Sequence, residues 1–155
     1  MKLSPRIVDQ GFRALNWFHR VVMRASAGRL GRRAFGMDVV ELVTVGRRTG
    51  HAHSTILTVP VIEGGTLVLV ASKGGDDRDP DWLKNLVATP DIEVTWRGER
   101  HDMTARLASP QEYERLWPKV VASYRSYDSY RRRTARVIPL VICIPREGPR
   151  DSPKD

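Results

Sequence analysis

Three short segments of the sequence bring together polar side chains that can bind or activate a small molecule. The first is the basic turn Gly46-Arg47-Arg48-Thr49-Gly50, whose amides and guanidinium groups can converge on a phosphate or a carboxylate. The second is Ser72-Lys73-Gly74-Gly75, where glycines let a ligand approach the backbone and the lysine supplies a positive charge. The third places Tyr124, Tyr127 and Tyr130 three residues apart, and a phenol can donate a hydrogen bond to a ligand carbonyl.

Each segment also has an interpretation without a ligand. A basic turn is commonly a solvated hairpin end, and tyrosines commonly cover the edge of a core. Asp76, Asp77 and Asp79 lie close to the second segment and would repel an anion. The run Arg131-Arg132-Arg133 and the nearby Arg136 either hold an acidic group or form a solvated face. No single segment therefore establishes a site.

The side chains needed for catalysis without a cofactor do not form a set. His51 and His53 share one face of an expected strand, but no nearby carboxylate or cysteine completes a metal site, so none is predicted. Cys143 is the single cysteine and lies in an apolar run, where a core position is expected. The sequence has no nucleophile elbow, no P-loop and no dinucleotide fingerprint. An enzyme built from this chain would take its reactivity from a cofactor.

Strands and turns must position these segments. Runs rich in β-branched and apolar residues predict about six strands, with hairpin turns at Gly64-Gly65 and Arg97-Gly98. The strands are expected at 39–45, 54–62, 66–72, 92–96, 100–107 and 137–144. Successive hairpins favour an antiparallel sheet curled into a small barrel, within an α+β fold that has short intervening helices.

Two helices between these strands have recognisable start signals. Asp79 is a favoured N-cap residue, and Pro80 is a favoured first residue of the helix that follows. Ser109 and Glu112 have the spacing of a capping box. A second helix is therefore expected to begin at Ser109 and to run towards Tyr124.

Two prolines are expected to disturb these elements. Pro118 lies inside the second helix, and because proline removes a backbone donor the helix should kink or break there. Pro139 lies inside the last strand. Proline is confined to edges and bulges of sheets, so that strand is expected at such a position.

The charge of the chain favours an anionic partner. Lys and Arg number 26 against 18 Asp and Glu, which gives a net charge of +8 and a pI near 10.2. Residues 1–37 are the most basic part, and their apolar residues recur at helical spacing. This amphipathic helix and its loop either pack on the core or lie on an anionic bilayer. Residues 38–145 form the expected domain, and 146–155 a loose polar tail.

No apolar stretch is long enough to span a bilayer, and the N-terminus lacks the features of a signal peptide. A cytoplasmic protein is therefore expected. If the N-terminal helix lies on lipid, the protein contacts the inner face of the cell membrane. The sequence leaves the oligomeric state open.

Taken in order, several motifs resemble the deazaflavin-dependent nitroreductase family of actinobacteria. The resemblance covers about Val39 to Ile144 and depends on the order and spacing of the motifs rather than on any one of them. The motifs are Thr44-Val45-Gly46-Arg47-Arg48-Thr49-Gly50, Val70-Ala71-Ser72-Lys73-Gly74-Gly75, Pro80-Asp81-Trp82-Leu83-Lys84-Asn85-Leu86, Leu116-Trp117-Pro118, Tyr124-Arg125-Ser126-Tyr127-Asp128-Ser129-Tyr130 and Arg136-Val137-Ile138-Pro139.

The resemblance implies a split β-barrel that binds coenzyme F-420, a deazaflavin with a phosphate and an oligoglutamate tail. It places Arg47, Arg48, Thr49 and Lys73 along the phosphate and tail, which suits their charge. The remaining implied coenzyme contacts are His53, Ser54, Thr55, Ile56, Leu57, Val70, Ala71, Ser72, Asp81, Trp82, Leu83, Lys84, Asn85 and Tyr127.

The resemblance also implies a reaction, namely transfer of a hydride from reduced F-420 to an electron-poor small molecule such as a quinone, an enone or a nitro-aromatic. Tyr127 corresponds to the position nearest the deazaflavin ring, and Ser72, Tyr124 and Tyr130 correspond to the acceptor side. Tyr127 or Tyr130 is the expected hydrogen-bond donor for developing negative charge, with Ser72 as a rival.

The sequence departs from the family pattern at several of these contacts. His53 stands where an arginine is frequent, and Ile56 replaces a common proline. Asp81, Leu83 and Lys84 differ from the usual apolar or aromatic residues. The departures leave the coenzyme class unchanged and bear on the acceptor and on affinity for the tail.

Two alternatives remain at the level of sequence. An FMN-binding reductase on a similar barrel would also need a phosphate site, so composition does not separate it from a deazaflavin enzyme. A non-enzymatic basic module would bind membrane or nucleic acid. A nucleic-acid-binding surface typically has aromatic residues interleaved with Lys and Arg. The segment 124–133 shows this pattern only crudely, so no nucleic acid is expected as a partner.

Overall fold

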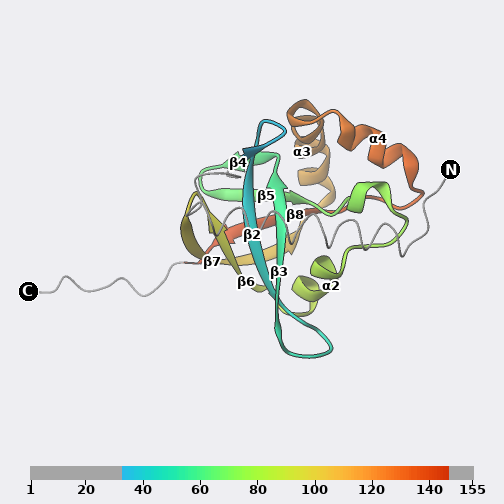
Figure 1. Ribbon diagram of the computed structural model, residues 1–155. Helices are drawn as coiled ribbons and strands as arrows, with labels where there is room; N and C mark the ends of the chain where they lie inside the picture. Colours follow the sequence, from blue (N-terminus) through green and yellow to red (C-terminus); the bar gives the residue numbers. More distant parts are fainter. Residues whose placement is uncertain (1–32, 147–155) are drawn as a thin grey trace, which may run out of the picture.

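The computed structural model describes residues 33–146, which form one eight-stranded antiparallel sheet and three α-helices (Figure 1). The helices are α2 (Asp81–Ala88), α3 (Pro110–Ser123) and α4 (Ser126–Arg133), and a short 3-10 helix, η1 (Lys73–Gly75), precedes them. The strands are β1 (Arg33–Ala34), β2 (Met37–Val45), β3 (Ala52–Val59), β4 (Val61–Glu63), β5 (Thr66–Val70), β6 (Asp91–Trp96), β7 (Glu99–Leu107) and β8 (Leu140–Pro145).

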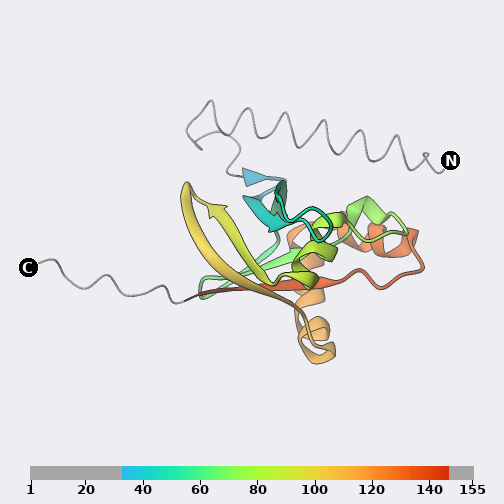
Figure 2. The same cartoon turned by 90° about the horizontal axis from the view of Figure 1, so that it is seen from below.

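The sheet curls but does not close among the described strands. Its order is β1-β2-β6-β7-β8-β5-β4, and β3 pairs with β2 alone. Figure 2 shows the helices gathered at one end of the curled sheet and the β6–β7 hairpin at the other. The predicted α+β class, with an antiparallel sheet curled into a half-barrel and short helices between strands, is confirmed.

The strand count exceeds six for two reasons. Residues 33 and 34 form β1, a two-residue strand within the segment that was expected to be loop. The predicted strand 54–62 is divided at Pro60 into β3, which pairs with β2, and β4, which pairs with β5. Proline has no backbone donor and fixes its φ angle, so the chain leaves one ladder at Pro60 and enters another.

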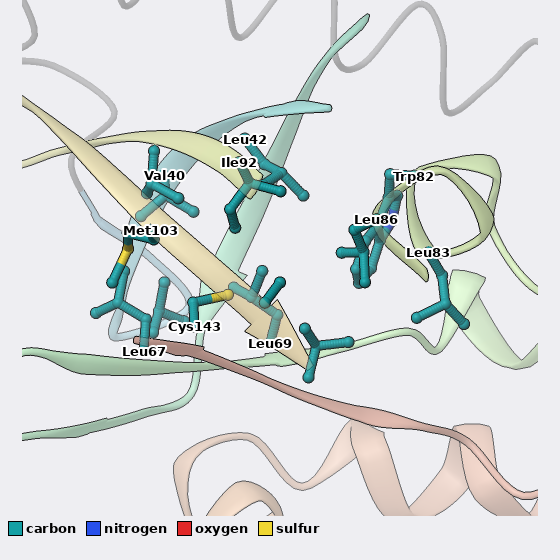
Figure 3. Packing of buried hydrophobic residues seen from close by; sticks show 14 of the residues in the cluster. Val40, Leu42, Leu67, Leu69, Trp82, Leu83, Leu86, Ile92, Met103 and Cys143 are labelled. Carbon is teal, nitrogen blue, oxygen red and sulfur yellow. The ribbon is translucent and has the colours of Figure 1, made fainter. Parts of the chain in front are cut away.

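The hydrophobic core lies on both faces of the central strands. In β5, Leu67 and Leu69 belong to one buried cluster, whereas Val68 and Val70 belong to a second. Successive strand residues point to opposite faces, so the uninterrupted apolar run of β5 is explained by burial on both. The first cluster packs under α2 and contains Cys143 (Figure 3). The second packs against α3 and α4.

The predicted cap of α2 is wrong. Pro80 occupies the N-cap position and no side chain caps the helix. The Asp79 carboxylate instead accepts a hydrogen bond from Arg136 Nη1 at 3.0 Å. A guanidinium is a stronger partner for a carboxylate than a backbone amide is, and α2 begins one residue later than expected.

Pro118 does not break its helix, and Pro139 does not lie in an edge strand. Helix α3 continues through Pro118 without a break to Ser123, and the buried Trp117 and Val120 pack on either side of it. Strand β8 begins after Pro139 and lies between β5 and β7, so it is not an edge strand. The Pro139 carbonyl still accepts from Ala71 N at 3.0 Å, because proline lacks only the donor.

The capping box at the start of α3 is confirmed. Ser109 Oγ accepts from Glu112 N at 3.2 Å, and Ser109 N donates to Glu112 Oε1 at 3.0 Å. Arg106 adds two hydrogen bonds to the same carboxylate, at 2.7 and 2.9 Å. The hydrogen bonds from Arg106, and then those from Ser109, lower the pKa of Glu112 to about 2.

This lowered pKa predicts an acid-dependent loss of stability. The ionised form is favoured in the folded state, so the contribution of Glu112 is complete above its usual pKa of 4.5 and is lost as the pH falls towards about 2. We expect the thermal midpoint of Glu112→Gln to change less than that of the wild type across this interval. Parallel thermal melts at each pH measure the difference, and curves that stay parallel would contradict the assignment.

The sequence features assigned to the ends of the chain lie mostly outside the described residues. These features are the basic amphipathic helix within 1–37, of which only 33–37 is described, and the polar tail, of which only Arg146 is described. Within the described part of the chain, no helix is long and apolar enough to cross a membrane.

Candidate functional site

A polar pocket of about 490 Å³ opens between the turn 46–50, the first residues of β3 and the start of α2. Nine of its lining residues were implied by the family resemblance, and Thr44 and Gly46 were not. The nine are Arg47, Arg48, Thr49, His53, Ser54, Thr55, Asp81, Trp82 and Asn85. Segments that lie far apart in the sequence therefore meet in one pocket of a size typical for small-molecule sites.

A buried amide organises the pocket. Asn85, only 5% exposed, accepts hydrogen bonds from Arg47 N at 3.2 Å and from Arg47 Nη1 at 3.0 Å. Its Nδ2 donates to Thr44 Oγ1 at 3.3 Å. Along β2, Thr44 continues the inward-facing series of Val40 and Leu42. A polar residue at a position where the alternation predicts an apolar one is a sequence signal that could have identified Thr44 as part of the site. The amide thus fixes both the turn and the Arg47 side chain.

The two arginines of the turn differ in how they are held. Arg47 is bound on one side by Asn85 and on the other by Asp81, whose Oδ1 lies 3.3 Å from Arg47 Nη2. Arg48 is exposed and makes no hydrogen bond or ion pair with any residue between 33 and 146. One guanidinium is therefore fixed and the other is available, a combination that suits a ligand carrying phosphate or carboxylate groups.

The three tyrosines meet on and beside α4. Tyr127 is 6% exposed, and its hydroxyl lies 2.9 Å from Thr58 Oγ1, where either atom can donate. Tyr124 and Tyr130 contact its ring edge-on, with centroids 5.6 and 6.0 Å away. Burial raises the pKa of both Tyr127 and Tyr130. Both phenols therefore stay protonated at neutral pH and can act as donors.

The segment 72–75 packs directly against α4. Lys73, Gly74 and Gly75 all have positive φ angles, of 46°, 63° and 82°. A Cβ on Gly75 would lie 3.0 Å from the Tyr130 carbonyl oxygen, so only glycine fits this close approach. Ser72, buried at 8% exposure, precedes this turn. The fold thus brings the second and third polar segments of the sequence together.

Several implied contact residues support the pocket instead of lining it. Val70, Ala71 and Leu83 are buried in the hydrophobic core, and Leu57 packs against it. Lys84 is exposed on α2, and Ile56 lies on β3 beyond the pocket. None of these six residues is among the residues that line the pocket.

Strand β3 joins the two polar regions. His53, Ser54 and Thr55 line the pocket near its start, and Thr58 bonds Tyr127 near its end. At about 3.3 Å per strand residue, five residues span about 17 Å. Among the described strands β3 pairs with β2 alone.

The histidine pair is not arranged as expected. His51 precedes β3 and lies in the turn, where its backbone N donates to Thr49 Oγ1, whereas His53 lies on the strand and lines the pocket. Between residues 33 and 146 no group of three His, Cys, Asp or Glu side chains could hold a metal ion. Cys143 is fully buried, and burial raises the pKa of its thiol to about 12, as suits a core residue and not a nucleophile.

Comparison with known proteins defines the class of this fold and site. A solved F-420-H2-dependent reductase is 35% identical, with a TM-score of 0.62 over 68% of this chain and 92% of that chain. A second solved structure, described as a domain-swapped dimer, is 31% identical with a TM-score of 0.65, over 82% of this chain and 96% of that one. The architecture is therefore the split β-barrel of F-420-dependent reductases, as the resemblance implied.

The particular family follows from the sequence comparisons. A family model described as F-420H(2)-dependent quinone reductase matches residues 16–145. An F-420H(2)-dependent quinone reductase of Mycobacterium tuberculosis is 37% identical over 132 residues, which cover 83% of this chain and 88% of that protein. A putative enzyme of the same description from Mycobacterium bovis matches equally. The chain belongs to the F-420H(2)-dependent quinone reductase family.

Proposed function

We propose that this protein transfers a hydride from reduced coenzyme F-420 to an electron-poor small molecule, with a quinone as the first candidate and enones and nitro-aromatics as others. The observation that carries the proposal is the polar pocket built by Arg47, Arg48 and Asn85 in a chain of this family. The pocket lies near the start of β3, and the other end of this strand meets the tyrosine cluster through Thr58.

The residues of the pocket fit the anionic end of this coenzyme. Arg47 is held in place, Arg48 is exposed, and the turn between Gly46 and Gly50 supplies further polar groups. Thr49, His53, Ser54 and Thr55 would continue the contacts onto β3, while Asp81, Trp82 and Asn85 close the opposite wall. Lys73 would add positive charge from the η1 turn. When bound, the reduced deazaflavin supplies the hydride.

The protein's share of the reaction is positioning and a hydrogen bond. Tyr127, backed by Thr58, would lie nearest the ring, and Tyr124, Tyr130 and Ser72 would face the acceptor. A protonated phenol donates to the negative charge that develops on an acceptor oxygen as it is reduced. Burial of Tyr127 and Ser72 also excludes water from this region. On this proposal the implied contacts Ile56, Leu57, Val70, Ala71, Leu83 and Lys84 would border or support the coenzyme groove.

A direct assay tests the proposed activity. Reduced F-420 is mixed with the purified full chain and a water-soluble menaquinone analogue, and the return of oxidised coenzyme absorbance is followed. Saturable turnover that depends on the protein is expected, and NADH with FMN should not replace the reduced coenzyme. Turnover only with NADH and FMN would favour the FMN-binding alternative, and a salt-sensitive shift of nucleic acid without any turnover would favour the non-enzymatic module.

Gly46→Ala is expected to disturb the pocket more than the fold. A Cβ there would lie 2.6 Å from His53 Nε2 and 2.7 Å from Thr49 Oγ1, so both side chains must move. Because both are side-chain atoms, we expect a loss of about 1 kcal/mol in unfolding free energy but a clear weakening of coenzyme binding. Urea denaturation and a fluorescence titration measure the two effects. Unchanged binding in a folded variant would show that the pocket does not hold the coenzyme.

We also propose a location for the reaction. Residues 38–145 carry the site, and the basic segment 1–37 would attach the cytoplasmic protein to the inner face of the membrane, where quinones reside. The full chain should then sediment with anionic vesicles at low salt and release at high salt. Equal sedimentation with neutral vesicles, or none with either, would argue against this attachment.

A further inference from the structure

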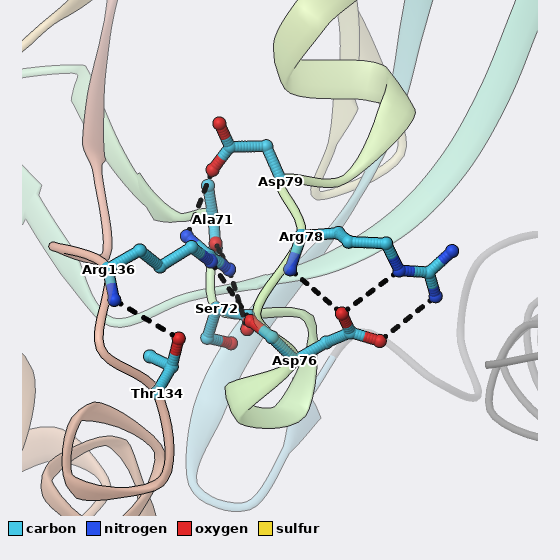
Figure 4. A network of polar contacts seen from close by, with 7 residues as sticks. All are labelled: Ala71, Ser72, Asp76, Arg78, Asp79, Thr134 and Arg136. Carbon is cyan, nitrogen blue, oxygen red and sulfur yellow. Dashed lines mark hydrogen bonds and ion pairs between the residues drawn. The ribbon is translucent and has the colours of Figure 1, made fainter. Parts of the chain in front are cut away.

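Arg136 makes an extended set of contacts that the proposed reaction does not use. Its side chain, 15% exposed, lies between α4 and β8. Nε donates to Asp76 O at 2.9 Å, and Nη1 donates to Asp79 Oδ1 at 3.0 Å. Nη2 donates to Ala71 O at 2.9 Å and to Ser72 O at 3.1 Å. Figure 4 shows the guanidinium inserted into the loop that these four residues form.

These contacts exclude a solvated face for Arg136, and the acidic group that it holds is the side chain of Asp79. A solvated arginine would not lie almost buried with all three nitrogens engaged. An arginine that holds an acidic ligand would keep a pair of donors free, whereas four of the five N–H groups here have protein acceptors. The charge is compensated by one carboxylate, that of Asp79, and otherwise by backbone carbonyls.

The acceptors of Arg136 belong to elements on both sides of the candidate site. Asp79 directly precedes Pro80 and α2, the helix that brings Asn85 to the pocket. Ala71 and Ser72 follow β5 and lead into η1. Arg136 itself follows α4, the helix of Tyr127 and Tyr130, and is steadied by a bond from its own N to Thr134 Oγ1 at 3.3 Å.

The loop between these elements has few apolar contacts to fix it. It contains no buried apolar residue between Ala71 and Pro80, and Lys73 adopts a φ of 46°, which is unfavourable for a non-glycine residue. Asp76 and Arg78 bind each other at 2.8 to 3.2 Å, a local pairing that shapes the turn. Arg136 is a long-range anchor for the loop, with partners 57 to 65 residues away.

We propose that Arg136 is a positioning residue that sets the separation between α2, which carries the coenzyme pocket, and α4 with Ser72, which carry the acceptor side. This role rests on the proposed function, because it concerns hydride transfer between the two regions. A planar guanidinium can reach four acceptors in different directions, and an ammonium cannot. Loss of the guanidinium should therefore let the two sides drift apart while each remains formed.

The test compares Arg136→Ala and Arg136→Lys with the wild type and with Arg115→Ala. Arg115 is a matched control, an arginine whose partner within residues 33–146 is the surface carboxylate of Glu63. In the free full-length proteins, hydrogen exchange of the Gly75 and Asp76 amides reports on the loop, since both donate to carbonyls within it. In the presence of coenzyme, a fluorescence titration gives Kd, and single-turnover mixing with the quinone analogue gives the transfer rate.

For Arg136→Ala we expect about tenfold faster exchange of the two amides and a transfer rate about 100-fold lower, since a displacement of about 1 Å can cost that much. Coenzyme Kd should change little, Arg136→Lys should fall between, and Arg115→Ala should match the wild type. Exchange at the wild-type rate, or a transfer rate within a factor of about three, would overturn the inference.

Two further outcomes are separable. If Arg136→Ala does not fold, Arg136→Lys and Asp79→Asn provide the same readouts, and wild-type values in both would overturn the role. If the wild type itself does not bind the coenzyme, the proposed function fails and the role in transfer fails with it. The exchange rates then still report whether Arg136 anchors the loop, so the two failures are distinguished.

Discussion

Tyr127→Phe is expected to lower the rate of acceptor reduction by about 100-fold, the scale on which loss of one transition-state donor acts. The substitution removes only the hydroxyl group, and the ring keeps its packing between Tyr124 and Tyr130. Coenzyme affinity should change far less than turnover, because the donor is needed mainly as negative charge develops on the acceptor. Steady-state turnover with several quinones and a coenzyme titration measure the two quantities.

Thr58→Val is the matched control for this prediction. It removes the hydrogen-bond partner of Tyr127, at 2.9 Å, and leaves the phenol in place. We expect a smaller loss of turnover, because the phenol is then less well oriented but can still donate. Unchanged turnover of Tyr127→Phe with every acceptor would remove Tyr127 from the role, and Tyr130→Phe and Ser72→Ala would be the next variants to compare.

The double substitution Arg47→Ala with Arg48→Ala is expected to weaken coenzyme binding by about 100-fold at low salt, taking about 1.5 kcal/mol for each lost charged hydrogen bond. Both arginines line the pocket, and their charge suits a phosphate and carboxylates. High salt screens such contacts, so the difference from the wild type should shrink as salt is raised. Fluorescence titrations at several salt concentrations measure this dependence.

A matched double substitution separates local contacts from net charge. Arg100→Ala with Arg115→Ala also removes two positive charges, but these arginines pair with Glu93 and Glu63 away from the pocket. Its affinity for the coenzyme should stay close to that of the wild type. Equal weakening in both double variants would mean that the overall charge attracts the coenzyme, and wild-type affinity in the pocket variant would contradict the proposed phosphate contacts.

Local signals predicted much of the fold. The hairpins at Gly64-Gly65 and Arg97-Gly98 are confirmed, and all four residues have positive φ angles, as tight turns of this kind require. The capping box at Ser109 is likewise confirmed, since its partners lie within one helical turn. Such features depend on interactions between residues that are close in the sequence, so they can be predicted from it.

The errors arose where a distant partner decides the local structure. Asp79 is drawn away from the start of α2 by Arg136, a residue 57 positions later. Pro118 is accommodated because the helix around it packs on the second core cluster. Pro139 sits just before an interior strand, and its carbonyl is used by Ala71. Burial and long-range pairing override local preference in each case.

The candidate site shows the same division. The basic turn and its flanking glycines were recognisable because one short segment supplies both the charge and the turn. The hydrogen bond between Asn85 and Thr44 was not recognisable, because these residues lie 41 positions apart and become partners only through the packing of α2 on β2. The contact of Thr58 with Tyr127 spans 69 residues and carried no signal in the sequence.

The most direct test of the central claim is a parallel titration of the full-length protein with F-420, FMN and FAD, followed by fluorescence. Saturable binding of F-420 alone, weakened by added salt, is the result expected from the arginine-lined pocket and the family of the chain. Binding of FMN in preference to F-420 would keep the barrel and contradict the assigned coenzyme. Binding of none of the three would contradict the pocket itself.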